Sequence, residues 1–162
     1  MAKPPRTSTR GTFFVTAITA NRRRLFQTET NANLFLDILQ HYRTQGLYKL
    51  HAYVAMPDHV HLLLTTDDLP KSMKHIRGGF SHRLPSKLDV WQRGYADHHV
   101  LTREEFESRR IYIHQNPVRA RLTTRPDEYP YSSAFRGSSS STKKSKPQSN
   151  QESPVRSIQT PI

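Results

Sequence analysis

Residues 53–64 read YVAMPDHVHLLL, in which two apolar stretches flank the turn-forming pair Pro57-Asp58. Side chains largely alternate in polarity over 48–56, which predicts one strand. The stretch 59–65 (HVHLLLT) is rich in aliphatic residues and predicts a second strand. Because only the turn separates them, the two strands are expected to pair as an antiparallel hairpin.

The sequence on both sides of this hairpin predicts two further strands and three helices. Residues 13–19 (FFVTAIT) indicate a strand, and a shorter strand is expected within 90–101. Apolar residues recur at helical spacing over 34–42 and 73–84, and a capping box opens a third helix over 102–115. The order β-α-β-β-α-β predicts an α+β, ferredoxin-like (split βαβ) antiparallel sheet with helices packed on one face, plus a C-terminal helix. The other face is expected to be free for a ligand.

Charge is the most informative property of the composition. The chain has 162 residues, with 25 Lys and Arg against 13 Asp and Glu, so its net charge is +12. This excess favours a polyanionic partner, with nucleic acid first. The lack of cysteine excludes a disulfide scaffold and a thiol nucleophile. Neither a membrane-spanning apolar run nor a secretory signal is evident, so we expect a cytoplasmic protein with no membrane partner.

The composition also changes along the chain. We expect a basic N-terminal arm over 1–12, one domain over 13–136 and a disordered tail over 137–162, which is rich in Ser, Lys and Pro. The two ends together carry half of the positive excess and the central domain carries the other half. The basic ends are therefore expected to help hold a polyanion.

His59 and His61 form the first candidate site. Alternate side chains of a strand share a face, so both imidazoles are expected on one side of the sheet while Val60 faces the other. Two imidazoles placed in this way can hold a divalent cation if a third ligand approaches. The alternative is a pair of partly exposed strand histidines without a ligand.

Tyr112 and Asn116 form the second candidate site. They are four residues apart on the predicted C-terminal helix and share a face with Arg109, one turn earlier. A phenol is a possible nucleophile toward phosphorus, an amide oxygen is a hard metal ligand and a guanidinium binds phosphate. As alternatives, Tyr112 is a core-edge tyrosine, and Asn116 before Pro117 is the N-cap of a short helix.

Together the two sites suggest one reaction. A cation at the histidines would stabilise the charge of a pentacoordinate phosphate while Tyr112 attacks in line. The product would be a covalent phosphotyrosine and a free 3′-hydroxyl, a step that another 3′-hydroxyl can reverse without ATP. Such chemistry suits strand transfer better than hydrolysis.

The chain resembles the HUH single-tyrosine transposases of insertion sequences, in particular the REP-associated tyrosine transposase branch. The resemblance runs from about Phe13 to Phe135 and rests on five blocks in the family's order: FFVTAITANRRRLF, YVAMPDHVHLLL, WQRGYADHHV, YIHQNPVRARL and DEYPYSSA. It implies a transposase that binds hairpin-containing single-stranded DNA and cleaves and rejoins it through a 5′-phosphotyrosine. It also implies Mg²⁺ or Mn²⁺ as cofactor, and a homodimer or a monomer.

The resemblance assigns the candidate residues individually. His59 and His61 are expected to bind the metal, Tyr112 to be the nucleophile and Asn116 to complete the metal site. The chain departs from the family twice. Asp58 stands where Asn is usual, which adds a negative charge beside the metal. Arg121 replaces a usual Gly; if that Gly is a left-handed helix cap, Arg costs about 1 kcal/mol or more, or the helix ends differently.

Further basic and aromatic residues are candidates for DNA contacts. Basic residues would bind phosphates and aromatic rings would stack on unpaired bases, although a solvated loop is an alternative for the arginine run and a core position for the tryptophan. These candidates are Arg22, Arg23, Arg24, Lys74, Arg77, Trp91, Tyr95, Arg109 and Arg119.

Two other functions remain open at the level of sequence. One is a non-catalytic single-stranded nucleic-acid-binding protein of ferredoxin-like fold, although the aromatic pattern of an RNA-recognition sheet is lacking. The other is a metal-dependent phosphohydrolase that uses an activated water.

Overall fold

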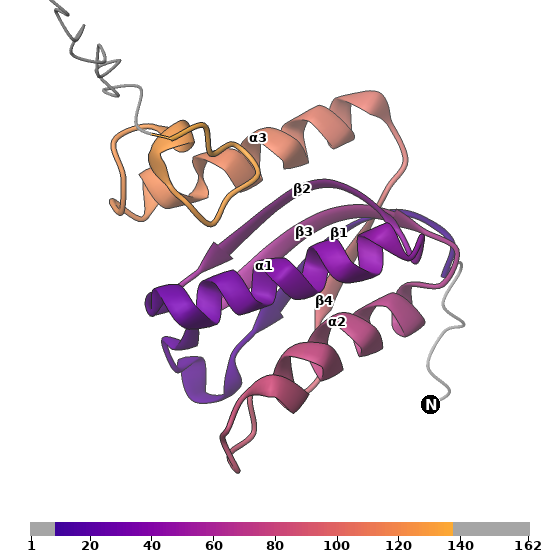
Figure 1. Ribbon diagram of the computed structural model, residues 1–162. Coiled ribbons are helices and arrows are strands. Elements are labelled where there is room, and N and C mark those ends of the chain that lie inside the picture. Colours follow the sequence, from indigo (N-terminus) through magenta and orange to yellow (C-terminus); the bar gives the residue numbers. More distant parts are fainter. Residues whose placement is uncertain (1–8, 138–162) are drawn as a thin grey trace, which may run out of the picture.

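The chain folds into strands and helices in the predicted order. The computed structural model describes residues 9–137, and Figure 1 shows them as a sheet between helices. The strands are β1 (Gly11–Ile18), β2 (Lys49–Met56), β3 (His59–Thr66) and β4 (Ala96–Val100). The helices are α1 (Glu29–Thr44), α2 (Leu69–Arg83) and α3 (Arg103–Arg119), with short 3-10 turns at Ala20–Arg22, Leu25–Gln27 and Pro126–Glu128. The disordered tail predicted over 137–162 lies almost entirely outside the described residues, as does most of the N-terminal arm.

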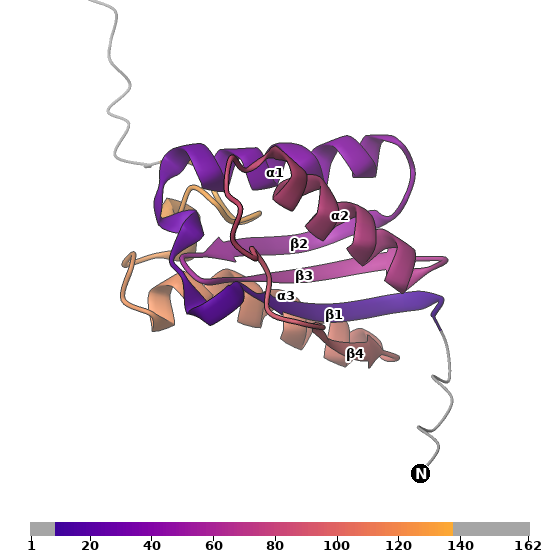
Figure 2. The same cartoon turned by 90° about the horizontal axis from the view of Figure 1, so that it is seen from below.

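The four strands form one antiparallel sheet in the order β2-β3-β1-β4 (Figure 2). The predicted hairpin is the β2-β3 pair, which Pro57 and Asp58 connect. β1 lies between β3 and β4, and its register sets Thr16 opposite His61. This arrangement confirms the predicted α+β, ferredoxin-like fold.

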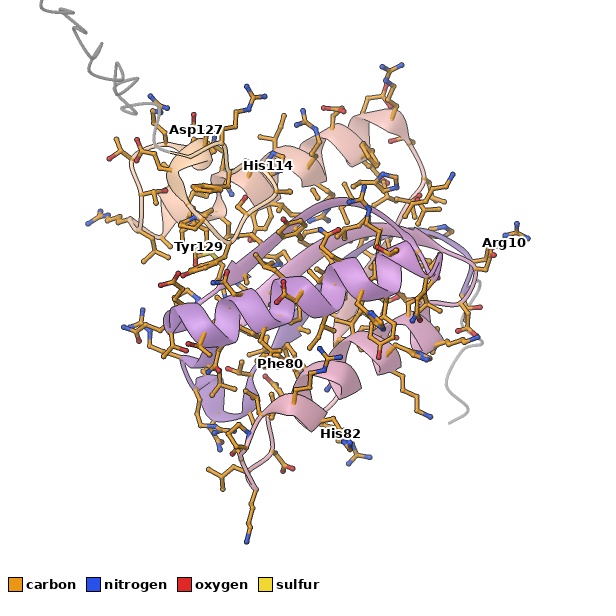
Figure 3. All side chains as sticks on the ribbon, viewed as in Figure 1. Arg10, Phe80, His82, His114, Asp127 and Tyr129 are labelled. Atoms are coloured by element: carbon orange, nitrogen blue, oxygen red, sulfur yellow. The ribbon has the colours of Figure 1, made fainter. Side chains whose placement is uncertain are left out.

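Helices α1 and α2 cover one face of the sheet and form the main core with it (Figures 1 and 2). Alternate residues of the strands supply the apolar side chains, as their period of two requires. Phe80 extends from α2 into this layer, whereas His82 points away from it (Figure 3). The buried core side chains of this face include Phe13, Val15, Phe35, Ile38, Val60, Leu62, Leu64, Ile76 and Phe80.

Helix α3 lies across the other face of the sheet (Figure 1). Ile113 is fully buried and packs with Phe14, Val54 and Leu63 in a second, smaller apolar cluster. The expectation that this face is free for a ligand is therefore wrong, because α3 packs on it. The apolar side of α3 needs a partner, and the second face of the sheet is the one that α1 and α2 leave open.

The ends of α3 follow from its sequence. Thr102 caps the first turn, since its Oγ1 accepts a hydrogen bond from the main-chain N of Glu105 at 3.1 Å. The helix runs beyond the predicted end, through Pro117 to Arg119. It closes at Arg121, which has a left-handed φ of 59°. The main-chain N–H groups of Arg121 and Leu122 donate to the carbonyls of Val118 and Pro117, a Schellman motif in which glycine would fit without strain.

The segment after α3 ties that helix to the edge strand β2. The Tyr129 hydroxyl donates to the Ala55 carbonyl at 2.7 Å, and the Ala55 amide donates to the Tyr131 carbonyl at 2.8 Å. Ser133 bonds the main chain of β2 and also lies 2.8 Å from Nε2 of His114 on α3. Figure 3 shows His114 and Tyr129 on this side of the sheet. The position of α3 is thus fixed by hydrogen bonds as well as by apolar packing.

None of the helices within residues 9–137 is long and apolar enough to cross a membrane.

Candidate active site

His59 and His61 face the α3 side of the sheet, as their spacing predicts. Their ring centroids are 4.8 Å apart and their planes cross at 77°. Val60, between them, is buried in the core on the opposite side. Two imidazoles at this separation can serve one cation, and imidazole is a common metal ligand.

Each imidazole is anchored through Nδ1. Nδ1 of His61 lies 2.8 Å from Oγ1 of Thr16, and Nδ1 of His59 lies 2.7 Å from Oδ1 of Asp58. No hydrogen bond within residues 9–137 uses Nε2 of either ring. Metal-bound histidines characteristically have one ring nitrogen held by a hydroxyl, carboxylate or carbonyl while the other binds the ion. The two side chains therefore fit a divalent cation by the chemistry of their donor atoms.

Burial keeps His61 neutral. His61 is only 5% exposed. This burial, together with the charges of His59 and Arg109, lowers the pKa of His61 to about 3. Only the neutral imidazole has a lone pair to offer a metal. His61 is therefore in the ligand-competent form at neutral pH.

Tyr112 reaches the histidine pair from α3. Its ring centroid lies 5.5 Å from that of His61 and 5.8 Å from that of Phe14, with nearly perpendicular planes in both contacts. The guanidinium of Arg119 lies 5.1 Å from the centroid of the Tyr112 ring, and that of Arg109 lies 4.6 Å from the centroid of Phe14. The structure thus gathers a phenol, two imidazoles and two guanidiniums from β3 and α3.

Asn116 lies one helical turn after Tyr112 and is half-buried. Because α3 continues through Asn116 to Arg119, the alternative that Asn116 caps a new helix is wrong. Within the part of the chain that the structure describes, no cluster of three or more His, Cys, Asp or Glu could hold a metal. A third protein ligand of another type, such as the Asn116 amide oxygen, stays a prediction.

Sequence comparison decides the family. The family model described as "Transposase IS200 like" matches residues 8–116, which include the histidine pair, Tyr112 and Asn116. The chain belongs to the IS200-like transposase family. A curated relative from Haemophilus influenzae, named after the REP-associated tyrosine transposases, is 22% identical over 146 residues, which span 78% of this chain and 81% of the relative.

Solved structures agree with the fold of an IS200-like transposase. A REP-associated tyrosine transposase bound to a REP hairpin aligns with a TM-score of 0.70 and 22% identity, over 82% of both chains. A Deinococcus radiodurans protein classed as a transposase aligns with a TM-score of 0.50 and 23% identity, over 70% of this chain and 95% of the other. The resemblance read from the five sequence blocks is confirmed.

Of the three consecutive arginines after β1, Arg22 lies beside the candidate site. Arg22 contacts Oδ2 of Asp58 through Nη1 at 3.3 Å, which brings it beside the histidine pair of this transposase-family chain. Arg23 instead donates to the main-chain oxygen of Asp89, and Arg24 is exposed. The charge of Asp58, one of the two departures from the family pattern, is therefore balanced by Arg22.

The remaining predicted DNA-binding residues lie away from the histidines, on the face that α2 covers. Lys74, Arg77, Trp91 and Tyr95 line a common groove of about 500 Å³ along α2. The centroid of the Trp91 ring lies within 6.0 Å of the ring centroids of Phe26, Phe35 and Phe80. Its Nε1 donates a hydrogen bond to the Arg77 carbonyl. This placement fits the core alternative for Trp91. A DNA contact by any of the four stays a prediction.

Thr16 and Phe14 are site residues that sequence reasoning missed. Both lie on β1 and face α3, where Thr16 holds His61 and the Phe14 ring stacks on it at 5.3 Å between centroids. A threonine and a phenylalanine in a predicted strand look like ordinary strand residues. The only available signal was the alternation of β1, which puts Phe14 and Thr16 on one face, but their partner depends on the strand register.

Proposed function

We propose that this protein cleaves and rejoins structured single-stranded DNA by attack of Tyr112 on a backbone phosphate. A divalent cation, Mg²⁺ or Mn²⁺, would be held by His59, His61 and Asn116. The observation that carries the proposal is the meeting of Tyr112 with His61, whose ring centroids are 5.5 Å apart although they come from α3 and β3. Membership of the IS200-like transposase family supports it.

The reaction is a transesterification at phosphorus. The phenol oxygen of Tyr112 forms a bond to phosphorus while the bond to the 3′ oxygen breaks. Tyr112 loses its proton, the departing 3′ oxygen gains one, and a 5′-phosphotyrosine remains on the protein. A 3′-hydroxyl of another strand can reverse the step and release Tyr112, which joins strands without an external energy source. A cation bound at the histidines supplies Lewis-acid stabilisation of the negative charge on the phosphate.

Arginines would orient the phosphate beside the nucleophile. Arg109 lies against Phe14 and close enough to His61 for its charge to lower the pKa of that imidazole. Arg119 lies over the Tyr112 ring, and Arg22 lies beyond Asp58. Guanidinium groups suit phosphate oxygens because they can donate two parallel hydrogen bonds.

The groove along α2 is a second proposed DNA contact, for the stem of a hairpin. It is lined by Lys74, Arg77 and Gly78, among others. A Cβ built on Gly78 would meet no atom within 4 Å, so the fold itself leaves open space there. Glycine is unfavourable inside a helix by roughly 1 kcal/mol relative to alanine, and one use that would justify it is close approach of a ligand. A solved structural neighbour, a REP-associated tyrosine transposase, is bound to a REP hairpin.

A covalent-capture assay tests the catalytic proposal. The full chain is incubated with a labelled hairpin oligonucleotide and Mn²⁺, and SDS-resistant complexes are resolved by electrophoresis. We expect an adduct with wild type, and none with Tyr112→Phe or with EDTA. Hairpin binding without any adduct would instead indicate a non-catalytic nucleic-acid-binding protein. Free product without an adduct, retained in Tyr112→Phe, would indicate a phosphohydrolase that uses water.

A salt titration of hairpin binding tests the groove. Lys74→Ala should weaken binding and reduce the slope of log affinity against log salt by about one. Lys71→Ala is the matched control, because Lys71 lies on the same helix but does not line this groove. Equal effects of the two variants would contradict a specific role for the groove.

A further inference from the structure

Asp58 is held in place from both its main chain and its side chain. Its carbonyl accepts hydrogen bonds from the N–H of Thr19 at 3.0 Å and from the Thr19 hydroxyl at 2.9 Å. Thr19 is completely buried, so these bonds are shielded from water. The carboxylate has one oxygen 2.7 Å from Nδ1 of His59 and the other 3.3 Å from Nη1 of Arg22. Its orientation is therefore determined by three neighbours.

The chemistry of this carboxylate decides which nitrogen of His59 carries the proton. One carboxylate oxygen of Asp58 faces Nδ1 of His59 and the other faces the cationic guanidinium of Arg22, a pair of neighbours that suits the charged carboxylate. An ionised carboxylate can only accept hydrogen bonds, so Nδ1 of His59 has to donate. In the neutral ring the lone pair is then on Nε2, the nitrogen that no hydrogen bond of residues 9–137 uses.

We propose that Asp58 is a positioning residue, which fixes His59 in the Nδ1–H tautomer and so presents Nε2 to a cation. The inference rests on the proposed metal site and adds to it the group that prepares the site before any metal binds. It also gives the departure from the family pattern a role. The negative charge of Asp58 is engaged by His59 and Arg22 and serves as their acceptor.

Thr16 has a weaker version of the same role toward His61. A hydroxyl can either donate to Nδ1 or accept from it, so Thr16 orients the ring without deciding the tautomer. The two histidines are therefore supported unequally. Loss of the Asp58 carboxylate should disturb its histidine more than loss of the Thr16 hydroxyl disturbs His61.

The turn that follows β1 contributes to this arrangement. Asn21 and Arg22 have φ values of 55° and 50°, in the left-handed region that side chains other than glycine seldom adopt. This conformation follows β1 directly and brings the Arg22 guanidinium to the second oxygen of Asp58. The Arg22 side chain is 64% exposed, so its ion pair with Asp58 contributes little to the free energy of unfolding. We assign Arg22 the role of orienting the Asp58 carboxylate.

Nuclear magnetic resonance of the metal-free full chain tests the proposal directly. Long-range ¹H–¹⁵N correlations of histidine rings distinguish the two neutral tautomers, and the His59 ring is assigned by its loss in His59→Gln. At about pH 8, where imidazoles are largely neutral, wild type should show Nδ1–H for His59. Asp58→Ala should lose this preference, and Asp58→Asn, which keeps an acceptor oxygen, should restore it. An unchanged His59 pattern in Asp58→Ala would overturn the proposal.

Thr16→Val is the matched control, because it removes a hydrogen-bonding partner of the other histidine. It should alter the His61 correlations and leave those of His59 in the Nδ1–H pattern. A change at His59 of the same kind as in Asp58→Ala would show that the tautomer follows general loosening of the site, and would also overturn the proposal.

Mn²⁺ titration of the same samples separates this inference from the metal site on which it rests. Mn²⁺ broadens resonances near it, so the midpoint of broadening at His59 and His61 reports affinity. Asp58→Ala should weaken affinity by about 10- to 100-fold, the usual cost of losing a partner of a metal-bound histidine. If wild type shows no broadening at either ring, the proposed metal site fails. If wild type and Asp58→Ala bind equally, only the role of Asp58 fails.

Discussion

The two faces of the sheet differ in what their side chains do, although the same strands build both. Toward α1 and α2, Val60 and Leu62 are at most 1% exposed and touch other apolar residues of the main core. Toward α3, His59 and His61 alternate with them along β3 and meet polar partners. A strand with period two can therefore separate stability from chemistry at adjacent positions.

The difference also shows how each face is held. The α1 and α2 face depends on a large apolar core. The α3 face has fewer buried apolar side chains and includes two imidazoles, so packing alone contributes less to it. Hydrogen bonds from the segment that contains Tyr129 and Ser133 fix α3 on this face. Substitutions on the two faces should consequently have different effects.

The largest effect is expected for His61→Gln, which removes a proposed metal ligand from the α3 face. Adduct formation with hairpin DNA should fall by at least about 10- to 100-fold, because loss of a ligand costs no less than loss of its supporting partner. The free energy of unfolding should change by about 1 kcal/mol, since one polar side chain replaces another. Covalent capture and urea denaturation measure the two quantities. Retained activity would contradict the proposed metal site.

Leu62→Ala tests the other face at the very next residue. Leu62 is completely buried against α1 and α2, so the shorter side chain should lower the free energy of unfolding by about 2–5 kcal/mol. Adduct formation per folded molecule, measured at low temperature, should stay near the wild-type amount. If Leu62→Ala instead lost activity while keeping its stability, the claim that the α1 and α2 face contributes stability and the α3 face contributes activity would be contradicted.

Tyr129→Phe tests the attachment of α3. Its hydroxyl bonds the Ala55 carbonyl, and loss of this buried bond should cost about 1–3 kcal/mol of unfolding free energy. Tyr131→Phe is the control, because Tyr131 bonds the same residue through its main chain and should retain stability. Equal losses in both variants would argue against the assigned role of the Tyr129 hydroxyl.

The effect of Tyr129→Phe should depend on pH in a defined direction. Burial, and to a lesser degree the nearby Tyr131, raises the pKa of Tyr129 from 10.0 to about 12. Below pH 10 the hydroxyl is protonated in both states, so its full stabilisation is present. As the pH rises from about 10 to about 12, the unfolded chain ionises first and the stabilisation is lost. The difference between wild type and Tyr129→Phe should therefore shrink across this range in urea titrations.

The smallest effect is expected at the end of α3. Arg121→Gly should raise the free energy of unfolding by about 1 kcal/mol, because glycine adopts the left-handed φ of 59° without a Cβ clash. Ala120→Gly is the control, since Ala120 has a φ of −80° and gains nothing from glycine. Stabilisation by both changes, or by neither, would contradict the assignment of strain to Arg121.

Much of the fold could be predicted from local pattern. The alternation around YVAMPDHVHLLL, the helical stripes and the capping box at Thr102 located the strands and helices closely. The covered second face could not be found in this way, because the buried residues of α3 are few. Only Ile113 and Pro117 are buried in that helix, and its other positions are polar or partly exposed. A pattern so weak does not reveal which surface the helix covers.

The sequence predicted the reactive side chains of the candidate site but not the residues that hold them in place. His59, His61, Tyr112 and Arg109 were singled out because imidazole, phenol and guanidinium carry recognisable chemistry. The structure brings these side chains together, and their roles stay predictions. Thr16 was missed because its role depends on the pairing of β1 with β3. Asp58 was noticed as a departure from a family pattern, but its contact with Arg22 depends on the left-handed turn after β1, whose backbone the sequence does not specify.

The identity of the residue that carries the DNA tests the central claim most directly. Covalent complexes with hairpin DNA can be digested with nuclease and trypsin and analysed by mass spectrometry. Trypsin cuts after Arg110 and Arg119, which releases residues 111–119 (IYIHQNPVR), a peptide with Tyr112 as its single tyrosine. We predict that the nucleotide mass is on this peptide. A nucleotide on any other peptide, such as one that contains Tyr95 or Tyr129, would contradict the assignment of Tyr112 as the nucleophile.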